Sequence, residues 1–406
     1  MKTIALSTYA DAREAYRHKG LQQALYDEGQ RLMSGVIVNL HGQAHLDRRR
    51  LENRLFRRDV FAWFEAERIP EIIASVLDRA IAAGRADLLP LARRTMMTLS
   101  IAVAGVDRVV GDDAELDELY ALMDRLARAS TVAHAVGDKT AIIDDGDRAL
   151  GEFSERFFTP SLDRRRRLIE SFESGAIAED ELPRDVLTTL LRNQDRLELP
   201  PDIVLREVAY FPWVGSHSTS NQLVHAMHHV FEWIEARPND RERLSADRIL
   251  LQRFVHESLR LHPASPVSLR HAREDIVLKS GVEIPRGSLV AVELDKANRD
   301  PSVWGDHADE FDPFRPLAEG VMPWGLSFGH GVHACLGQEL AGGLECPAHV
   351  TAGSNDDPGD HLYGSIAVMA RAILLAGARR DPADPPRRDE STTRQVWGRY
   401  PVVFAR

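Results

Sequence analysis

The chain has 406 residues, of which 44% are hydrophobic, and a formal net charge of -11. This length is enough for a large core and by itself suggests two or three domains, while the negative charge argues against a nucleic-acid partner. The two cysteines, Cys335 and Cys346, make no disulfide framework and favour a reducing compartment. Residues 1–5 begin no apolar stretch long enough for a signal peptide or a membrane anchor. We therefore expect a cytoplasmic protein with no membrane association.

Apolar residues at three- and four-residue spacing predict helices through the first part of the chain and one long helix near its middle. Short apolar runs punctuated by Gly281 and Pro285 predict strands further on. The expected elements, in chain order, are helices from Tyr9 to about Gly137, a charged helical stretch from Asp145 to Glu181, a long helix from about Pro201 to Ala236, strands between Pro266 and Val292, a loop from Pro382 to Asp389 and a strand from Gln395 to Phe404. Helices followed by a small sheet are typical of the α+β class, here mostly α.

One cysteine near the C-terminal end lies in a glycine-rich run, Phe328-Gly329-His330-Gly331-Val332-His333-Ala334-Cys335-Leu336-Gly337. Glycines let the backbone turn tightly, and amide N–H groups in such a loop can point at the sulfur and stabilise a thiolate. A buried structural cysteine is the alternative for an isolated Cys335. The run resembles the cysteine-ligand loop of the cytochrome P450 superfamily, F-x-x-G-x-x-x-C-x-G, at every fixed position.

Two further motifs of that superfamily follow in the expected order. Glu257 and Arg260 are three residues apart in the helical run from Leu250 to Leu261, so they share a helix face and can pair. The segment from Asp309 to Arg315 resembles the meander that supplies a second arginine to this pair. The resemblance implies that Arg315 joins Glu257 and Arg260 in a buried ion network behind the heme.

The resemblance implies one heme-thiolate domain over residues 1–406, with a single-domain cytochrome P450 fold. The segment from Ser7 to Tyr26 is similar to the second helix of the family, so we expect the first helix and the opening strands to be missing. Gly, Pro, Asn and Asp are dense between Gly343 and Gly364, which predicts a loop where relatives continue the helix that follows the cysteine. We expect Cys346, in this insertion, to be accessible, unlike Cys335.

The cofactor implied by the resemblance is heme b, with Cys335 as the metal ligand and Phe328 and Gly337 in the heme-binding loop. The family's H-x-x-x-R pattern is matched by His45 and Arg49. Two more positions that hold heme in the family are occupied by Arg270 and His333. Heme propionates are carboxylates, and arginine binds carboxylates with paired, charge-assisted hydrogen bonds. Ordinary surface cations are the alternative for each residue alone.

The oxygen-activating motif of the family, A/G-G-x-D/E-T-T, is altered in this chain. Its glycine is kept as Gly215, which we expect to leave room for a diatomic ligand, and its two threonines correspond to Ser218 and Thr219. His217 replaces the acid. Histidine can relay protons because its ordinary pKa is about 6.5, but an inert substitution explains the sequence equally well, and both interpretations stay open.

The resulting prediction is a monooxygenase that inserts one oxygen atom from dioxygen into a small organic substrate. The sequence contains no flavin or nicotinamide fingerprint, so a separate donor of the ferredoxin and ferredoxin reductase type is expected. The altered acid and threonine favour an alternative, a heme-thiolate enzyme outside the oxygenase cycle that performs peroxide-driven oxidation, dehydration or rearrangement. A non-enzymatic heme protein that binds a ligand is the third possibility.

Overall fold

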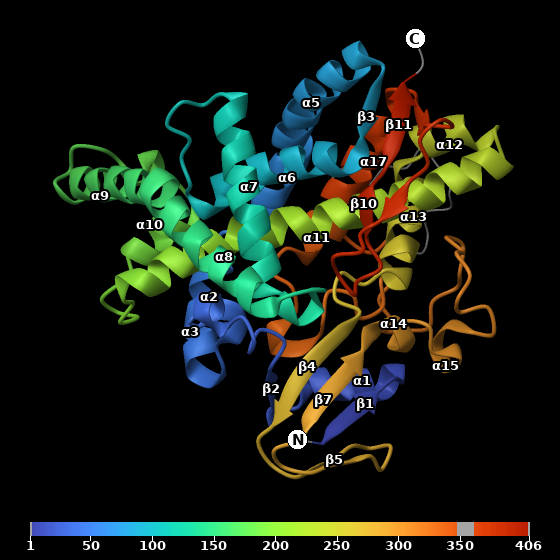
Figure 1. Ribbon diagram of the computed structural model, residues 1–406, viewed down its shortest axis with the longest axis horizontal. Helices are drawn as coiled ribbons and strands as arrows, with labels where there is room; N and C mark the ends of the chain where they lie inside the picture. The colour runs from blue at the N-terminus through green and yellow to red at the C-terminus, as the bar shows by residue number, and fades with distance from the viewer. Residues whose placement is uncertain (1, 347–360, 405–406) are drawn as a thin grey trace.

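The computed structural model describes residues 2–346 and 361–404, and a helical body lies above a small sheet in the view of Figure 1. The predicted α+β class, mostly α, is confirmed. The helices are α1 (Tyr9–Arg17), α2 (Gln30–Met33), α3 (Gly42–Glu52), α4 (Arg58–Trp63), α5 (Ile69–Ala83), α6 (Leu88–Ala104), α7 (Asp113–Ser130), α8 (Lys139–Phe153), α9 (Thr159–Glu173), α10 (Val186–Leu191), α11 (Pro201–Ala236), α12 (Asp240–Ala246), α13 (Arg248–Leu261), α14 (Leu294–Ala297), α15 (Pro301–Trp304), α16 (Gln338–Gly342) and α17 (Ser365–Leu375).

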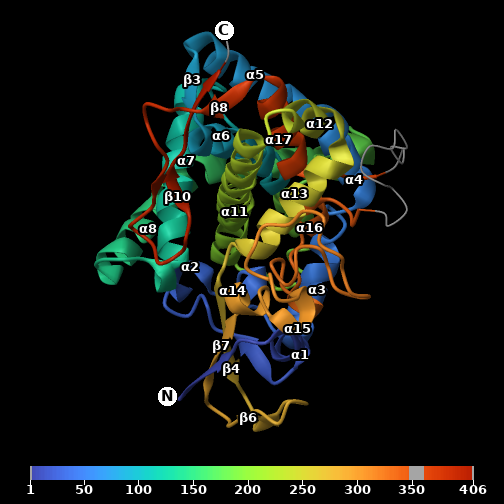
Figure 2. The ribbon, with the colours of Figure 1, turned by 90° about the vertical axis from the view of Figure 1, so that its right-hand side faces the viewer.

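The long helix α11 runs through the centre of the helical body, with α6, α13 and α17 around it (Figure 2). It begins at Pro201, where a missing N–H costs nothing because the first turn has no acceptor for it. Its bounds, Pro201–Ala236, are those predicted, and the buried Pro212 lies inside it. Over the described residues, none of the helices combines the length and apolar character needed to cross a bilayer.

The largest sheet has four strands in the order β1-β7-β4-β2. Their bounds are β1 (Thr3–Leu6), β2 (Leu21–Gln23), β4 (Val267–Ala272) and β7 (Leu289–Glu293). The expected absence of opening strands is corrected by β1, which pairs in parallel with β7. The four residues of β1 are too few to give a strand signal in the sequence. Their pairing depends on β7, which is far away along the chain.

Apart from β3, the strands of the smaller sheets come from the C-terminal part of the chain. Their strands are β3 (Arg85–Asp87), β5 (Ile276–Val277), β6 (Glu283–Ile284), β8 (Ala378–Arg380), β9 (Arg387–Arg388), β10 (Trp397–Arg399) and β11 (Pro401–Phe404). The strands expected between residues 266 and 292 and at the C-terminal end are therefore confirmed. β11 lies between β3 and β8, so the last described residues pair with a segment close to α6.

The helix after the cysteine loop is interrupted, as predicted. α16 ends at Gly342 and α17 begins at Ser365, and the two ends of the interruption lie side by side because Leu344 N–H donates to Leu362 O at 2.8 Å. Glu65 accepts hydrogen bonds from the backbone N–H groups of the two residues before Ser365, at 2.8 and 2.9 Å. The polar stretch from Thr351 to Asp360 lies outside the described residues.

The expected contrast between an accessible Cys346 and an inaccessible Cys335 is wrong, because Cys335 is exposed where it lines the cavity and Cys346 is half-buried. The Cys346 side chain lies against the main hydrophobic cluster, and its Sγ atom lies 3.4 Å from Gln252 Oε1. The Gln252 side-chain amide also donates to the carbonyl oxygens of Leu344 and Leu362, at 3.0 and 3.1 Å. The stem of the interruption is thus packed on α13, a contact that its polar composition does not predict.

A buried ionic cluster joins α3 to α11. Arg48 Nη1 donates to Glu207 Oε2 at 2.5 Å, and Ile37 N–H donates to the same carboxylate at 3.1 Å. Glu52 is fully buried, and in the described part of the chain neither of its carboxyl oxygens has a hydrogen-bond partner. Burial raises the pKa of Glu207 to about 7, although Arg48 and Ile37 N–H lower it. Burial, and then the charge of Glu207, raise the pKa of Glu52 well above its ordinary value.

This cluster makes stability depend on pH. When folding raises the pKa of a carboxyl group, the folded state is the one that holds the proton more tightly. The stability that this group contributes is fully present below its unfolded pKa and is lost as the pH rises through its folded pKa. For Glu207, the rise from 4.5 to about 7 corresponds to roughly 3 kcal/mol lost across that window. We expect Glu52→Gln to recover part of this loss near pH 8 and to change stability less near pH 5, as measured by urea unfolding of the holoprotein. Glu319→Gln, at an exposed position, is the control, and equal destabilisation by Glu52→Gln at both pH values would contradict the prediction.

Candidate heme-thiolate site

A cavity of about 320 Å³ lies between α11 and the cysteine loop. Ligand pockets usually measure roughly 300–1,000 Å³, so this cavity has the size of a small-molecule site. One face of α11 lines it, through residues spaced three or four apart: Tyr210, Phe211, Val214, Gly215, Ser218, Thr219 and Gln222. That spacing places side chains on a single helix face.

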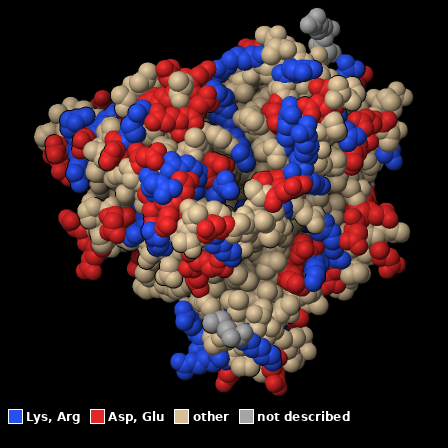
Figure 3. Space-filling view, in the orientation of Figure 1, with Lys and Arg blue, Asp and Glu red and all other residues tan. Residues whose placement is uncertain are grey.

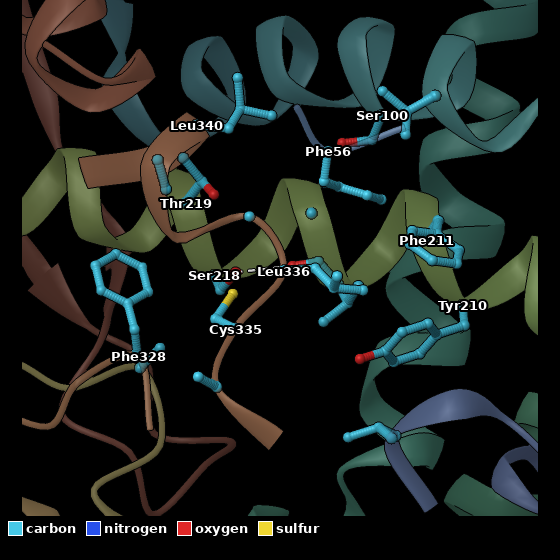
Figure 4. Close-up of a pocket in the computed structure, with 18 of the residues that line it drawn as sticks. Phe56, Ser100, Tyr210, Phe211, Ser218, Thr219, Phe328, Cys335, Leu336 and Leu340 are labelled. Carbon is cyan, nitrogen blue, oxygen red and sulfur yellow. Dashed lines mark hydrogen bonds between the residues drawn. The ribbon is translucent and has the colours of Figure 1, made fainter. Parts of the chain in front are cut away.

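Cys335 enters the cavity from the loop opposite α11 (Figure 4). Its N–H donates to Phe328 O at 2.9 Å, which closes the loop on itself. Gly331 has a φ of 73°, and a Cβ atom there would lie 2.9 Å from Tyr16 O, so this turn requires glycine. Burial raises the pKa of the Cys335 thiol, while the Gly337 backbone N–H and Arg49 lower it. The amide directed at the sulfur is the feature that the sequence predicted for a thiolate.

A hydrogen-bonded network holds this loop to α13. Arg260 donates from Nη2 to Glu257 Oε1 at 2.7 Å, and Arg315 Nε lies 3.4 Å from the same oxygen, so the predicted trio is confirmed. Asn298 connects the trio to the loop: its Nδ2 donates to Arg260 O at 3.0 Å, and its Oδ1 accepts from Leu326 N–H at 2.8 Å. The ion network therefore positions the start of the loop backbone through Asn298.

Three of the four predicted cations surround the loop. His45, Arg49 and His333 line the cavity, with the two imidazole centroids 4.0 Å apart and Arg49 Nη2 donating to Ala334 O at 2.6 Å. Burial, followed by the charge of Arg49, lowers the pKa of His45 to about 4. Burial and then His45 lower the pKa of His333 to about 3. Both rings are consequently neutral near pH 7, and each retains one N–H donor.

Arg270 is not among the lining residues. Its guanidinium is buried beneath the sheet, where Nη1 donates to Gln23 Oε1 at 2.5 Å and to Ser268 Oγ at 2.8 Å. Its charge still lowers the pKa of His333. Arg270 therefore acts on the cavity through its field, whereas Phe328 and Gly337, the two other loop residues expected at the cofactor, do line the cavity.

The lining is chemically suited to a flat apolar group that carries carboxylates and a metal. Among the described lining residues there is one arginine, with no Asp or Glu to balance it. No group of three or more His, Cys, Asp or Glu in residues 2–346 and 361–404 could hold a metal ion by itself. A single thiolate is sufficient where a macrocycle provides the other ligands, as in heme. Heme therefore fits the residues present.

Two hydroxyl groups of α11 face the loop. Ser218 Oγ donates to Val214 O at 2.7 Å, and Thr219 is buried in the cavity wall. Gly215 also lines the cavity, but a Cβ atom there would lie 2.7 Å from Ser100 Oγ of α6. The missing side chain therefore permits close packing of α6 on α11, which differs from the expected role of leaving room for a diatomic ligand.

His217 lies outside the cavity. Its Nδ1 is 3.0 Å from Trp213 O, its Nε2 is 3.3 Å from Asp124 Oδ1 of α7, and its ring stacks on Tyr120. Burial lowers the pKa of His217, while the hydrogen bond with Asp124 raises it. The structure thus brings Ser218, Thr219 and Gly215 to the cavity and directs His217 towards α7.

Several lining residues were missed by the sequence analysis. Tyr210 extends its hydroxyl into the cavity, and Phe56, whose ring stacks on Phe211 at a centroid distance of 5.9 Å, also lines it (Figure 4). Burial raises the pKa of Tyr210 well above its ordinary value, so the phenol is neutral. Tyr210 is eight residues before Ser218, and helical spacing alone places the two on one face. No comparable signal in the sequence identifies Phe56.

The fold and the cysteine loop together define the heme-thiolate class of site. The family model described as cytochrome P450 matches residues 2–342, and the chain belongs to that family. Vitamin D(3) 25-hydroxylase of Pseudonocardia autotrophica is 40% identical over 105 residues, which are 26% of this chain and 24% of that protein. Cytochrome P450 BJ-3 of Bradyrhizobium diazoefficiens is 43% identical over 113 residues, 26% of each chain. Each match spans about a quarter of the relative's own length.

Solved structures share the fold over nearly all of the chain. The crystal structure of CalO2 matches with a TM-score of 0.73 and 21% identity, over 99% of this chain and 90% of that one. P450BioI, in complex with hexadec-9Z-enoic acid ligated acyl carrier protein, matches with a TM-score of 0.75 and 18% identity, over 99% and 92% of the two chains. At this level of identity the similarity shows the fold alone.

The position of His217 predicts a structural effect of its removal. We expect His217→Ala to lower the free energy of unfolding by about 1–2 kcal/mol, because the largely buried ring loses its stacking on Tyr120 and its hydrogen bond with Asp124, which keeps Arg93 as a neighbour. The spectrum of the ferrous carbon monoxide complex should stay unchanged. His307→Ala, which removes an exposed histidine paired with Glu310, is the control. Unchanged stability, combined with loss of turnover with dioxygen but not with peroxide, would instead support a proton relay.

Proposed function

We propose that the chain is a heme-thiolate monooxygenase that inserts one oxygen atom from dioxygen into a small organic substrate. The observation that carries the proposal is the arrangement of Cys335, on its glycine loop, opposite two hydroxyl-bearing residues of α11 across an apolar cavity. The name of the Pseudonocardia relative, a hydroxylase, supports the same reaction class.

In this proposal Cys335 Sγ binds the iron of heme b, and the Gly337 N–H stabilises the thiolate. Arg49, His45 and His333 hold the propionates, Arg49 as a charged donor and the two neutral imidazoles through N–H groups. Heme iron with a thiolate ligand supplies the activation of dioxygen and the cleavage of its O–O bond. The protein provides the sulfur, the orientation of the group and a cavity that excludes water.

Protons reach the cavity through hydroxyl groups of α11. Ser218 and Thr219 face the cavity. The Ser218 hydroxyl donates to Val214 O in this structure, so it must rotate towards the cavity to pass a proton on. Phe211, Val214 and Phe56 surround them with apolar surface, which limits the water that can enter. Two electrons must come from outside the chain, and we assign them to a ferredoxin-type donor.

One observation favours a second function. No carboxylate lines the cavity among the described residues, and the histidine in the acid position points towards α7. An enzyme that uses peroxide brings its own protons and needs no acid at this place, and neither does a dehydratase or an isomerase. This alternative keeps Cys335 and the heme and changes only the source of oxygen or the reaction class. A heme protein that only binds a ligand is the remaining alternative.

The role of Cys335 can be tested by spectroscopy. We expect Cys335→Ala to abolish the red-shifted Soret band of the ferrous carbon monoxide complex, because that band requires a thiolate ligand. Cys346→Ala should retain it, because the Cys346 side chain packs on α13 away from the cavity. Retention of the band by Cys335→Ala together with its loss in Cys346→Ala would refute the assignment.

Use of dioxygen and use of peroxide can be distinguished by comparing the turnover that each oxidant supports. We expect product formation with dioxygen, ferredoxin and ferredoxin reductase to exceed that with hydrogen peroxide, and Ser218→Ala to lower the former more than tenfold while sparing the latter. The reason is that the hydroxyl group is needed only where protons must be delivered. Val38→Ala, elsewhere in the lining, is the matched control. Turnover with peroxide alone would support the second function.

A further inference from the structure

One polar group of the heme cavity has no part in the proposed reaction. Tyr210 lies on the same face of α11 as Ser218, and its hydroxyl group extends into the cavity that Cys335 enters from the opposite side (Figure 4). A phenol hydroxyl can donate one hydrogen bond and accept another. This group can therefore bind a polar atom placed in the cavity.

Two aromatic neighbours hold the ring of Tyr210 in a fixed orientation. The ring packs edge-to-face against Phe211, with centroids 5.5 Å apart, and against Trp213, with centroids 5.3 Å apart. Both neighbours are buried, and edge-to-face packing is a preferred geometry of aromatic pairs. The hydroxyl group is thus positioned before a ligand arrives, which reduces the entropy that is lost on binding.

The hydroxyl group of Tyr210 has no partner within the protein. Across residues 2–346 and 361–404 no hydrogen bond engages it, and the group is open to the cavity. Two other phenols have partners, because the Tyr120 hydroxyl accepts a hydrogen bond from Arg93 and the Tyr400 hydroxyl lies 3.0 Å from His228 Nδ1. Tyrosine hydroxyls inside proteins usually have a hydrogen-bond partner. For Tyr210, a molecule in the cavity can supply it.

The surroundings of Tyr210 differ from the outer surface, where basic and acidic residues are interspersed over the face shown in Figure 3. Burial raises the pKa of Tyr210, and the neighbours that raise it further are all acidic groups: Tyr26, Cys335, Glu207 and Glu52. The phenol therefore keeps its proton near pH 7 and donates, whereas a negative ligand group would meet these same acidic neighbours. A neutral acceptor is the partner that this position favours.

A second phenol of the lining, Tyr26, has surroundings of the opposite kind. Its hydroxyl likewise makes no hydrogen bond to the described part of the chain. Burial raises the pKa of Tyr26, but its strongest charged neighbours are Arg394 and Arg270, which lower it. Tyr26 and Tyr210 thus offer the same chemical group in basic and acidic surroundings, and Tyr26 provides a matched comparison.

The cavity wall next to Tyr210 is apolar. Phe211 stacks on Phe56 with ring centroids 5.9 Å apart, and Val38 also lines the cavity. Apolar walls of this kind bind the body of a ligand, while a few placed polar groups fix its orientation. A ligand that matches this wall is apolar except for the atom that reaches Tyr210.

We infer that Tyr210 donates a hydrogen bond to the neutral carbonyl oxygen of an otherwise apolar substrate, such as a ketone or an ester. The inference rests on the proposed monooxygenase function and names the chemical class of its substrate. Because the ring of Tyr210 is fixed, the hydrogen bond sets the orientation of the substrate relative to Cys335. Tyr210 is then a specificity-determining residue that takes no part in the chemical step.

The experiment compares three ligands with one ring system: methyl naphthyl ketone, isopropylnaphthalene and naphthoate, all substituted at the same ring position. They have similar shapes and offer Tyr210 a neutral acceptor, no acceptor and an anion, respectively. Binding to the holoprotein is followed by the spin-state shift of the ferric heme. We expect the ketone to bind at least tenfold more tightly than naphthoate.

Variants isolate the hydrogen bond. Tyr210→Phe removes only the hydroxyl oxygen, and it should raise the Kd of the ketone roughly fivefold, as the loss of one neutral hydrogen bond does. The Kd of isopropylnaphthalene should stay unchanged. Tyr26→Phe, the matched control, should leave the ratio of these two Kd values as in the wild type. The ferrous carbon monoxide spectrum of both variants should match that of the wild type.

The infrared carbonyl stretch of the bound ketone gives a second readout, which does not depend on affinity. A hydrogen bond to the oxygen weakens the C=O bond and lowers the frequency of this stretch. We therefore expect a higher frequency in Tyr210→Phe than in the wild type, and no change in Tyr26→Phe.

Other outcomes overturn the inference. An equal loss of affinity for the ketone and the hydrocarbon in Tyr210→Phe would assign the residue to packing, and an unchanged carbonyl stretch would show that no hydrogen bond forms. Tighter binding of naphthoate than of the ketone would exclude a neutral substrate class. Weaker heme retention by Tyr210→Phe, with unchanged affinity for the ketone, would assign the hydroxyl to the cofactor. Failure of the proposed function is separate, because turnover or the thiolate band would be absent in the wild type while the carbonyl stretch still depended on Tyr210.

Discussion

The buried guanidinium of Arg260 is the interaction on which the rest of the structure depends. Its side chain has no exposed area, and it donates to Glu257, to Asn298 O at 2.6 Å and to Ala308 O at 2.7 Å. It thereby fixes α13, the segment after β7 and the meander at one point. Removing one partner from such a pair typically costs about 3–5 kcal/mol, since a charge is left buried alone. Because Asn298 donates to Arg260 O and accepts from Leu326 N–H, the network also positions the backbone that leads into the cysteine loop.

Opposite faces of the cavity have different chemistry. The loop side has a thiol, an arginine and two neutral imidazoles, whereas α11 contributes hydroxyl groups, a phenol and apolar side chains. Positive charge with no carboxylate among the lining residues favours an anionic group on the loop side. The α11 side, which lacks charge, is suited to apolar substrate. The two faces therefore separate cofactor binding from substrate binding before either molecule arrives.

The sequence predicted the parts of this site that depend on short-range order. The cysteine loop, the Glu257–Arg260 pair and the bounds of α11 follow from motif spacing and helical period, and the structure has all three. His217 was considered together with Ser218 because the motif lists them in succession. The pairs Val214–Gly215 and Ser218–Thr219 lie on the side of α11 that faces the cavity, and His217, about 100° further round the helix from Ser218, lies on the side towards α7. Strand β1 and the burial of Arg270 depend on pairing between distant segments, which no local pattern encodes.

The side-by-side ends of the interruption between α16 and α17 have a consequence for how this chain tolerates insertions. Leu344 and Leu362 are hydrogen-bonded neighbours. The fold therefore already sets the distance between the two ends of any loop that joins them. Loop-closure entropy then grows by only about 0.6 kcal/mol for each doubling of length. The connection is accordingly a permissive graft point, at which a segment of almost any size can be gained or exchanged while the two helical halves remain in register.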